Sequence, residues 1–357
     1  MLSMTLEYKK KIIVLGTGGT IAGKSALASD NVGYVASQIG VMQLLDAIPS
    51  LSGANGHAVY DDCELVCEQV SQIDSKDMNF EVWQRLLARC QRWLAQDCVV
   101  GIVITHGTDT LEETAFFLHC ALKTDKPVVL TCAMRPATAL APDGPQNLLD
   151  ALAVASSDCK KDGISGVVAV CAGVIHSAVD VQKVHNYRLD AFSSGDAGVL
   201  GYVKEGKLDI CRKYEINSRL VGVFVASAAT NNIAKLASLT RDLSHDLLHD
   251  LPRVEIVLNH SGTTGAIVEA LLAQRHTATS NKLAGIVVAA TGNGTISKEL
   301  EIALQQAESA GVNVWRSTRC AFGALVGKAD AQFGDSGGLT PVKARIALML
   351  HLAASAK

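Results

Sequence analysis

Apolar residues in the first part of the chain form short uninterrupted runs that alternate with longer stretches in which they recur at helical spacing. The short runs are typical of strands buried on both faces of a sheet and occupy residues 12–15, 99–104, 127–130 and 166–171. Residues 64–70, which polar side chains interrupt, are interpreted as a further strand. The helical stretches cover residues 41–48, 80–94, 111–122 and 144–155. Strand and helix recur in turn without hairpin signals, which predicts a parallel α/β sheet with right-handed crossovers.

The same alternation returns near the end of the chain, after a polar interval. It predicts strands at 254–258, 284–289 and 312–315 and helices at 265–274, 298–310 and 341–354. A length of 357 residues is long for one hydrophobic core, which favours two domains. We therefore expect a larger parallel-sheet α/β N-terminal domain at residues 1–202, a linker at 203–250 and a smaller α/β C-terminal domain at 251–357. His245 and His249 in that linker are interpreted as solvated rather than metal-binding.

Composition narrows the classes of function. Hydrophobic residues make up 48% of the chain but aromatic residues only 4%, which suits small aliphatic side chains between parallel strands and covering helices. A net charge of -3 gives no basis for a nucleic-acid or membrane-surface partner, and no apolar segment approaches the length of a membrane span or a secretory leader. The ten cysteines are scattered, and the closest pair, Cys63 and Cys67, has no matching second pair. We therefore expect free thiols in a reducing cytoplasm and no metal site.

The first strand ends in a glycine- and threonine-rich loop, residues 16–23, that leaves the hydroxyls of Thr17 and Thr20 at its carboxyl end. Open α/β sheets bind ligands at this end of their strands. Residues 18–25 match the phosphate-binding P-loop pattern, but a P-loop also needs an apolar strand that ends in aspartate and a helix that begins at once, and neither is predicted. A dinucleotide fingerprint lacks its third glycine at Ile21. The third interpretation is a loop that presents a threonine nucleophile.

Two further loops, Ser75–Asp77 and Thr108–Asp109, carry hydroxyl and carboxylate side chains at predicted strand ends. Because parallel strands end at the same edge of a sheet, we expect the three loops to converge there. A threonine hydroxyl is a poor nucleophile unless a neighbour takes its proton, and a second threonine beside an acid, ideally with a lysine, can form such a relay. Thr110 and Glu113 also form a predicted capping box for the helix after them, and Ser75 is a candidate cap for the helix at 80–94.

Three segments resemble the hallmark segments of the bacterial-type L-asparaginase and glutaminase family: Thr17–Gly23, His106–Glu113 and Ala133–Pro136. The resemblance covers nearly the whole chain in order, because it continues through Ser75–Met78, Asp143–Leu148, Leu200–Tyr202 and Pro341–Arg345. It implies a larger and a smaller α/β domain, no cofactor, and a homotetramer or homodimer with sites at the interface. It also implies hydrolysis of the side-chain amide of asparagine to aspartate and ammonia, with glutamine as an additional substrate. The P-loop match then becomes a coincidence within the family's own glycine loop.

The resemblance assigns catalytic roles to Thr20, Tyr34, Thr108 and Asp109 and substrate contacts to Ser75, Thr108, Asp109 and the backbone of Ala133. Thr20 corresponds to the primary nucleophile, and Tyr34 to the tyrosine of a mobile loop that helps to activate it. Asp109 corresponds to the acid that binds the substrate α-amine, and Ser75 to the residue that holds the α-carboxylate. These assignments are chemically coherent, because a tetrahedral oxyanion needs donors such as the Thr108 N–H.

Three departures from the family pattern leave alternatives open. Ser193 stands where the resemblance leads us to expect a lysine that supports the Thr-Asp pair, and Lys76 stands where a glutamine is common. We hypothesise that the Lys76 ammonium supplies the lost charge beside Asp109; the alternative is that Lys76 points into solvent. Thr295 replaces a common asparagine, and the short segment 323–341 does not identify the acid that relatives contribute to a neighbouring subunit.

From the resemblance we expect a cytoplasmic asparaginase that acts on a small amino-acid amide. One alternative is a relative that acts on glutamine or on the amide of a charged tRNA, and the near-neutral charge argues against the tRNA. A second is a P-loop nucleotide-binding protein. A third is an amino-acid-binding regulator that kept the pocket while its catalytic relay decayed, and the missing lysine motivates it.

Overall fold

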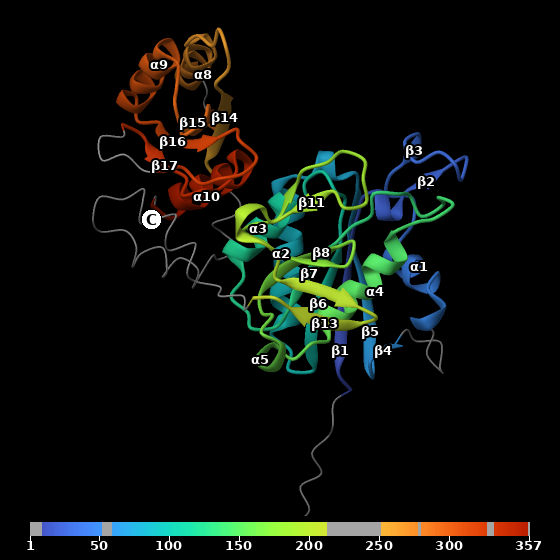
Figure 1. The fold of residues 1–357 in the computed structure, drawn as a ribbon. Coiled ribbons are helices and arrows are strands. Elements are labelled where there is room, and N and C mark those ends of the chain that lie inside the picture. Colours follow the sequence, from blue (N-terminus) through green and yellow to red (C-terminus); the bar gives the residue numbers. More distant parts are fainter. Residues whose placement is uncertain (1–8, 52–58, 213–250, 278–279, 327–331, 356–357) are drawn as a thin grey trace, which may run out of the picture. The chain divides into compact units, whose positions relative to one another are not determined.

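The computed structural model describes residues 9–51, 59–212, 251–277, 280–326 and 332–355. The chain divides into two compact units, one up to residue 214 and one from residue 215. Figure 1 shows both units, with helices and strands labelled where there is room.

The first unit is built on a nine-stranded sheet with the strand order β13-β12-β9-β8-β7-β6-β1-β5-β4. Its strands are β1 (Lys11–Gly18), β4 (Val59–Tyr60), β5 (Cys63–Ile73), β6 (Val99–Thr105), β7 (Val128–Thr131), β8 (Val167–Cys171), β9 (Val174–Ser177), β12 (Gly201–Lys204) and β13 (Lys207–Ile210). The central strands from β8 to β5 are parallel, as the alternation predicts. Residues 12–15 of β1 have no exposed surface, because layers of helices cover both faces of the sheet.

The outer strands are antiparallel, so the sheet is mixed rather than purely parallel as expected. Three strand pairs are joined by two-residue turns in which both residues have positive φ: Asp61–Asp62, Ala172–Gly173 and Glu205–Gly206. This is type I′ geometry, which Asn-Gly or Asp-Gly usually marks, so these three turns carry little sequence signal.

The hairpin of β12 and β13 extends beyond residue 202 into the segment that we expected to be a linker, and its strands pair within the sheet. The remainder of that segment from residue 213, with His245 and His249, lies outside the described residues.

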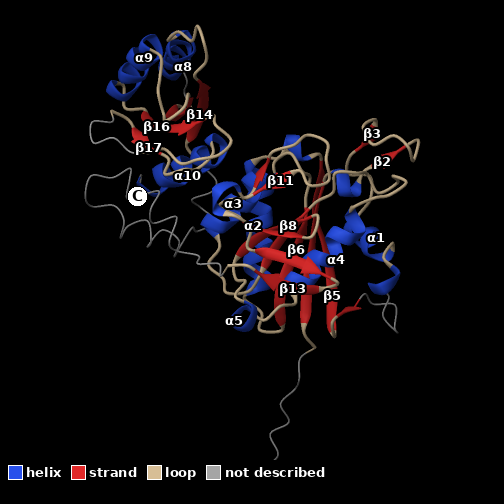
Figure 2. Ribbon diagram, viewed as in Figure 1, coloured by secondary structure: helices blue, strands red, loops and turns tan. Residues whose placement is uncertain are grey.

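Helices form a layer on each face of this sheet, as Figure 2 shows. α1 (Val41–Asp46) and α4 (Gly144–Ala155) share one hydrophobic core with β-strand residues such as Ile12 and Val103. α2 (Phe80–Leu94) and α3 (Leu111–Ala121) cover the other face, where Trp83 stacks on Phe117 with ring centroids 4.7 Å apart. The short helix α5 (Cys159–Asp162) precedes β8. The bounds of α2 and α4 are those that the sequence predicts.

Short irregular elements follow the central strands and carry most of the candidate chemistry. The 3-10 helices are η1 (Thr20–Ala22), η2 (Pro49–Leu51), η3 (Ser75–Asp77) and η4 (Gly195–Ala197), and the small hairpins pair β2 (Lys24–Ser25) with β3 (Tyr34–Val35) and β10 (Gln182–Lys183) with β11 (Phe192–Ser193). η1 and η3 begin directly after β1 and β5, which are neighbours in the sheet. Two of the three loops singled out by the sequence therefore start at the same sheet edge.

The second unit has a four-stranded parallel sheet in the order β14-β15-β16-β17. Its elements are β14 (Arg253–Leu258), α8 (Ala266–Thr277), β15 (Leu283–Ala290), α9 (Lys298–Ser309), β16 (Asn313–Thr318), β17 (Gly334–Asp335) and α10 (Pro341–Ser355). α10 packs closely against β15 at Gly285, because a Cβ atom on this residue would lie 2.8 Å from Leu348 Cδ2. Among the described residues, no helix is long and apolar enough to cross a membrane.

Candidate active site

The loops that follow β1, β5 and β6 contact one another through glycines that leave no room for a side chain. A Cβ atom at Gly19 would collide with the backbone of Gly107, and a Cβ at Gly107 would collide with the side chain of Ser75. Gly19 directly precedes Thr20, and Gly107 directly precedes Thr108. The convergence predicted for these loops is therefore present. It is possible because residues 19 and 107 are glycines and have no side chain.

Hydrogen bonds to neighbouring strand ends fix the backbone of the first loop. The Thr17 hydroxyl donates to the Thr105 carbonyl of β6 at 2.9 Å. The Gly19 N–H donates to the Ile73 carbonyl at 3.0 Å and to the Ser37 hydroxyl at 2.8 Å. Thr17, one of the two hydroxyls noted in the sequence, thus joins β1 to β6, and Thr20 is the hydroxyl that remains for chemistry.

Thr20 and Tyr34 form a close pair. The Thr20 Oγ1 and the Tyr34 hydroxyl oxygen are 2.6 Å apart, and Thr20 itself is buried. Tyr34 reaches Thr20 from β3, and its ring lies over Gly23, where a Cβ would be 2.8 Å from the ring atom Cδ2. The pairing expected from the resemblance is present, and a phenol oxygen lies where it can exchange a proton with the Thr20 hydroxyl.

The same segment rules out P-loop geometry. Lys24 and Ser25 form strand β2, which pairs with β3, instead of beginning a helix. A P-loop binds phosphate at a helix N-terminus, and only the three-residue η1 lies in this loop. The P-loop interpretation of residues 18–25 is therefore wrong.

A lysine that the sequence did not single out completes the second threonine pair. Lys183 Nζ donates to Thr108 Oγ1 at 2.8 Å and to Asp109 Oδ1 at 2.6 Å. The Lys183 side chain is 17% exposed and the Asp109 side chain 55% exposed, so the lysine approaches from the protein side and leaves the acid open to solvent. Lys183 lies on β10, opposite Phe192 on β11, while Ser193 lies opposite Gln182. The lysine expected at position 193 is therefore found at position 183, on the other strand of the same hairpin.

Lys76 lies elsewhere. Its Nζ forms ion pairs with Asp74 Oδ2 at 2.9 Å and Asp77 Oδ2 at 3.1 Å, and its side chain is 62% exposed. Hydrogen bonds to these two carboxylates raise the pKa of Lys76. The structure therefore places Lys76 with Asp74 and Asp77, and places Lys183 where the hypothesis put Lys76, beside Asp109.

Ser75 connects the second and third loops. Its hydroxyl is buried and accepts a hydrogen bond from the Asp109 N–H at 3.3 Å, while its carbonyl accepts one from the Thr110 hydroxyl at 2.8 Å. Two capping expectations are therefore wrong. Asn79, not Ser75, caps α2. Thr110 accepts no side-chain cap bond from α3, and its hydroxyl donates to the Ser75 carbonyl of η3.

His106 lies between β6 and Thr108 and is fully buried. Burial lowers its pKa to about 4, only partly opposed by the hydrogen bond that joins Nδ1 to the Gly107 carbonyl at 2.7 Å. The imidazole is therefore neutral at pH 7, and because a carbonyl only accepts, Nδ1 carries the proton. This supports a structural role for His106.

Ala133 completes the set of predicted residues. It is fully buried and packs against Ile21 and Ala22, the two residues that follow Thr20 in η1. The structure thus brings together Thr20, Tyr34, Thr108, Asp109, Ser75 and Ala133 through contacts between their own segments, and adds Lys183. In the part of the chain that the structure describes, no three histidine, cysteine or acidic side chains are grouped to hold a metal ion.

Two family models match the chain, one in each of its two units. Residues 11–215 match the model described as Asparaginase, N-terminal, and residues 253–357 match the model of the Glutaminase/Asparaginase C-terminal domain. The two matches leave out only residues 1–10 and 216–252.

Individual proteins are similar over nearly their full length. L-asparaginase 2 of Escherichia coli is 35% identical over 350 residues, which covers 96% of this chain and 88% of the relative. The Glutaminase-asparaginase of Pseudomonas fluorescens biotype A is 35% identical over 357 residues, covering 97% and 88%. The crystal structure of a probable cytoplasmic L-asparaginase from Campylobacter jejuni superposes with a TM-score of 0.78 at 36% identity and covers 96% of this chain and 95% of its own.

Proposed function

Because the chain belongs to the asparaginase family, we propose that it hydrolyses the side-chain amide of L-asparagine to L-aspartate and ammonia. One observation supports the proposal: two threonines on loops that contact each other each have a hydroxyl that is hydrogen-bonded to a different ionisable side chain. Tyr34 lies 2.6 Å from Thr20, and Lys183 lies 2.8 Å from Thr108. An amide carbon held between these loops would meet a nucleophile on one side and an activated water on the other.

In the first half-reaction, Thr20 Oγ1 attacks the amide carbon. Its proton passes to the Tyr34 oxygen with which it is hydrogen-bonded, while the Tyr34 hydroxyl passes its own proton on toward the leaving nitrogen. The tetrahedral oxyanion is stabilised by N–H donors, among them that of Thr108. The carbon–nitrogen bond then breaks, the leaving nitrogen takes up a proton, and ammonia departs, so that aspartate remains attached to Thr20 as an ester.

In the second half-reaction, water attacks this ester and restores the Thr20 hydroxyl. Because the Lys183 ammonium donates to Thr108 Oγ1, the proton of that hydroxyl must point away from Lys183, toward the substrate side. The Asp109 carboxylate holds Lys183 in place through its 2.6 Å ion pair. The Thr108–Asp109–Lys183 group is thereby oriented to guide the water and its proton.

The substrate zwitterion needs complementary groups beside this centre. We assign its α-amine to the solvent-open Asp109 carboxylate and its α-carboxylate to the Ser75 hydroxyl, with the Ala133 backbone at the carboxamide. The contacts among these segments support the assignment. We also propose glutamine as a slower substrate, since a glutaminase-asparaginase is among the similar proteins.

The alternative of a regulator with a decayed relay was motivated by a missing lysine. Lys183 occupies that role in the geometry, so the motivation disappears.

We further propose that the enzyme works in the cytoplasm and assembles as a homotetramer or homodimer. Nine free cysteines among the described residues and the cytoplasmic description of the Campylobacter jejuni protein support the compartment. Light scattering on the purified chain tests the assembly.

Ammonia release from L-asparagine, L-glutamine and their D-forms tests the activity. We expect wild-type turnover with L-asparagine, and its loss in Thr20→Ala and Thr108→Val. Thr17→Val is the matched control, because it removes a threonine hydroxyl of the same loop that only joins β1 to β6. Full activity in Thr20→Ala, or no ammonia from the wild type, would contradict the proposal.

A further inference from the structure

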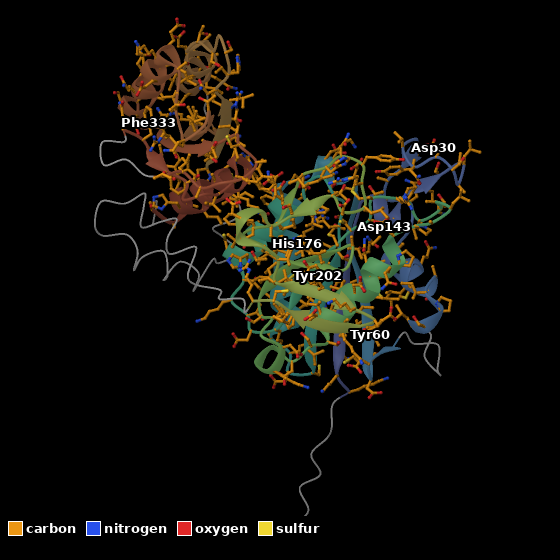
Figure 3. All side chains as sticks on the ribbon, viewed as in Figure 1. Asp30, Tyr60, Asp143, His176, Tyr202 and Phe333 are labelled. Atoms are coloured by element: carbon orange, nitrogen blue, oxygen red, sulfur yellow. The ribbon has the colours of Figure 1, made fainter. Side chains whose placement is uncertain are left out.

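The segment 132–135 follows β7, whose pairing with β6 and β8 ends at Thr131. The carboxylate of Asp143 accepts hydrogen bonds from this segment: Oδ2 accepts the Met134 N–H at 2.9 Å, and Oδ1 accepts the Arg135 N–H at 2.9 Å. Figure 3 labels Asp143 at the start of α4. Hydrogen bonds from N–H groups to an ionised carboxylate are about twice as strong as neutral ones. Both oxygens of Asp143 therefore hold two consecutive residues directly after Ala133.

Asn147, one turn further along α4, holds the same segment from its other end. Its Nδ2 donates to the Cys132 carbonyl at 2.9 Å and to Asp143 Oδ2 at 3.2 Å, and its Oδ1 accepts the Ala172 N–H at 2.9 Å. The amide has one orientation only, because the Cys132 carbonyl accepts and the Ala172 N–H donates. Asn147 therefore links the ends of β7 and β8 and orients the Asp143 carboxylate.

The first turn of α4 also contacts the segment that carries the nucleophile. A Cβ at Gly144 would lie 2.9 Å from Ile21 Cγ1 and 3.5 Å from the Ala133 Cβ. Ile21 is the residue after Thr20, and it packs with Ala133 in one small buried cluster. Any displacement of residues 132–135 therefore changes the packing of η1, in which Thr20 lies.

We propose that Asp143 and Asn147 are positioning residues for the reaction proposed above, acting by fixing the Ala133 backbone relative to Thr20. The inference depends on that proposed function. Neither side chain needs to touch substrate, because every hydrogen bond described for them goes to the segment, to each other or to Ala172. A displacement of about 1 Å at a reacting centre can reduce turnover about 100-fold.

Two isosteric variants test the proposal. Asp143→Asn replaces one acceptor oxygen with an NH₂ group that faces a backbone N–H. Asn147→Asp places carboxylate oxygens against the Cys132 carbonyl and Asp143. We expect at least a tenfold fall in kcat in each, with little change in KM and a native circular-dichroism spectrum. Asn147→Asp should recover part of its kcat relative to wild type as pH falls, because a protonated acid regains a donor.

Lys126→Met is the matched control for loss of stability. Lys126 precedes β7, at the opposite end of the strand from residues 132–135, and donates to the Leu94 and Gln96 carbonyls at 3.0 and 2.7 Å. It should lower the melting temperature and leave kcat unchanged. If Asp143→Asn fails to fold, Asp143→Glu keeps both acceptors and moves them by one methylene, and its kcat should still fall. A wild-type enzyme that releases no ammonia would refute the proposed function, whereas an active wild type with variants within twofold of its kcat would refute this inference alone.

Discussion

Lys183 Nζ donates a hydrogen bond to Thr108 Oγ1 at 2.8 Å, across 75 residues of sequence. The same ammonium forms a 2.6 Å ion pair with Asp109. One cation therefore orients a hydroxyl and compensates the acid beside it, which supports the catalytic role proposed for Thr108.

Replacing Lys183 should slow the second half-reaction. In Lys183→Met the Thr108 hydroxyl loses the donor that sets its orientation, and we expect kcat for ammonia release to fall about 100-fold or more, within the range for removal of a proton-transfer group. Lys76→Met is the control, because Lys76 pairs with Asp74 and Asp77 on the surface. Equal losses in the two variants would show that general charge, and not the contact with Thr108, matters.

Tyr34→Phe should isolate activation of the nucleophile. The ring remains over Gly23, while the hydroxyl oxygen 2.6 Å from Thr20 is removed. We expect kcat to fall about 100-fold with a small change in KM, since the lost group acts in the chemical step. Tyr187, which is 58% exposed, provides the same substitution as a control. Pre-steady-state measurement of the ester formed on Thr20 should show slower formation in Tyr34→Phe; an unchanged burst rate would contradict this role for Tyr34.

Gly19→Ala should separate steric collision from backbone strain. Gly19 has φ 85° and ψ -170°, and Gly198 has a similar conformation with φ 73° and ψ 169°. A Cβ at Gly198 meets nothing within 4 Å, whereas a Cβ at Gly19 collides with Gly107. Each alanine costs about 1–3 kcal/mol for the strained φ, and Gly19→Ala should cost about 1–3 kcal/mol more for overpacking.

Urea unfolding of the two variants measures that difference. Gly19→Ala should also lose activity, because the collision separates the loops of Thr20 and Thr108, while Gly198→Ala keeps it. Equal unfolding free energies for the two variants would mean that the two loops have room to separate without cost.

The sequence predicts the regular elements better than it predicts their edges. The bounds of α2 and α4 agree with the structure because their apolar residues recur at helical spacing between clear end signals. The antiparallel outer strands were missed, since turns such as Ala172–Gly173 and Glu205–Gly206 adopt positive φ without the usual asparagine or aspartate before glycine. Tertiary context selects these turns, and a local pattern does not record it.

The candidate site shows the same limit. Thr20 and Thr108 could be found because each follows a buried strand and a glycine in a long, specific motif. Lys183 lies on a two-residue strand whose partner is known only once the hairpin has formed. Its only sequence signal is a lysine between the apolar residues Val181 and Val184. Likewise, the capping pattern at Thr110 did not reveal that its hydroxyl donates to the Ser75 carbonyl of another loop and accepts no bond from the α3 backbone.

His106 should make stability depend on pH. Its pKa is lowered to about 4 in the folded protein, from an ordinary value near 6.5, because burial disfavours the charged ring. Between those two values the unfolded chain binds a proton at this position and the folded chain does not, so the free energy of unfolding falls as pH drops through that window. The full effect amounts to about 3 kcal/mol and is absent above the unfolded pKa.

His106→Asn tests this dependence, because asparagine keeps an N–H donor for the Gly107 carbonyl and does not titrate. Other groups titrate in both proteins, so the quantity to compare is the difference in unfolding free energy between wild type and variant, measured in urea at several pH values from 4 to 7. The wild type should lose stability relative to the variant as pH falls below 6.5. Parallel curves would mean that His106 is protonated alike in the folded and unfolded chains, and that its burial does not hold the ring neutral.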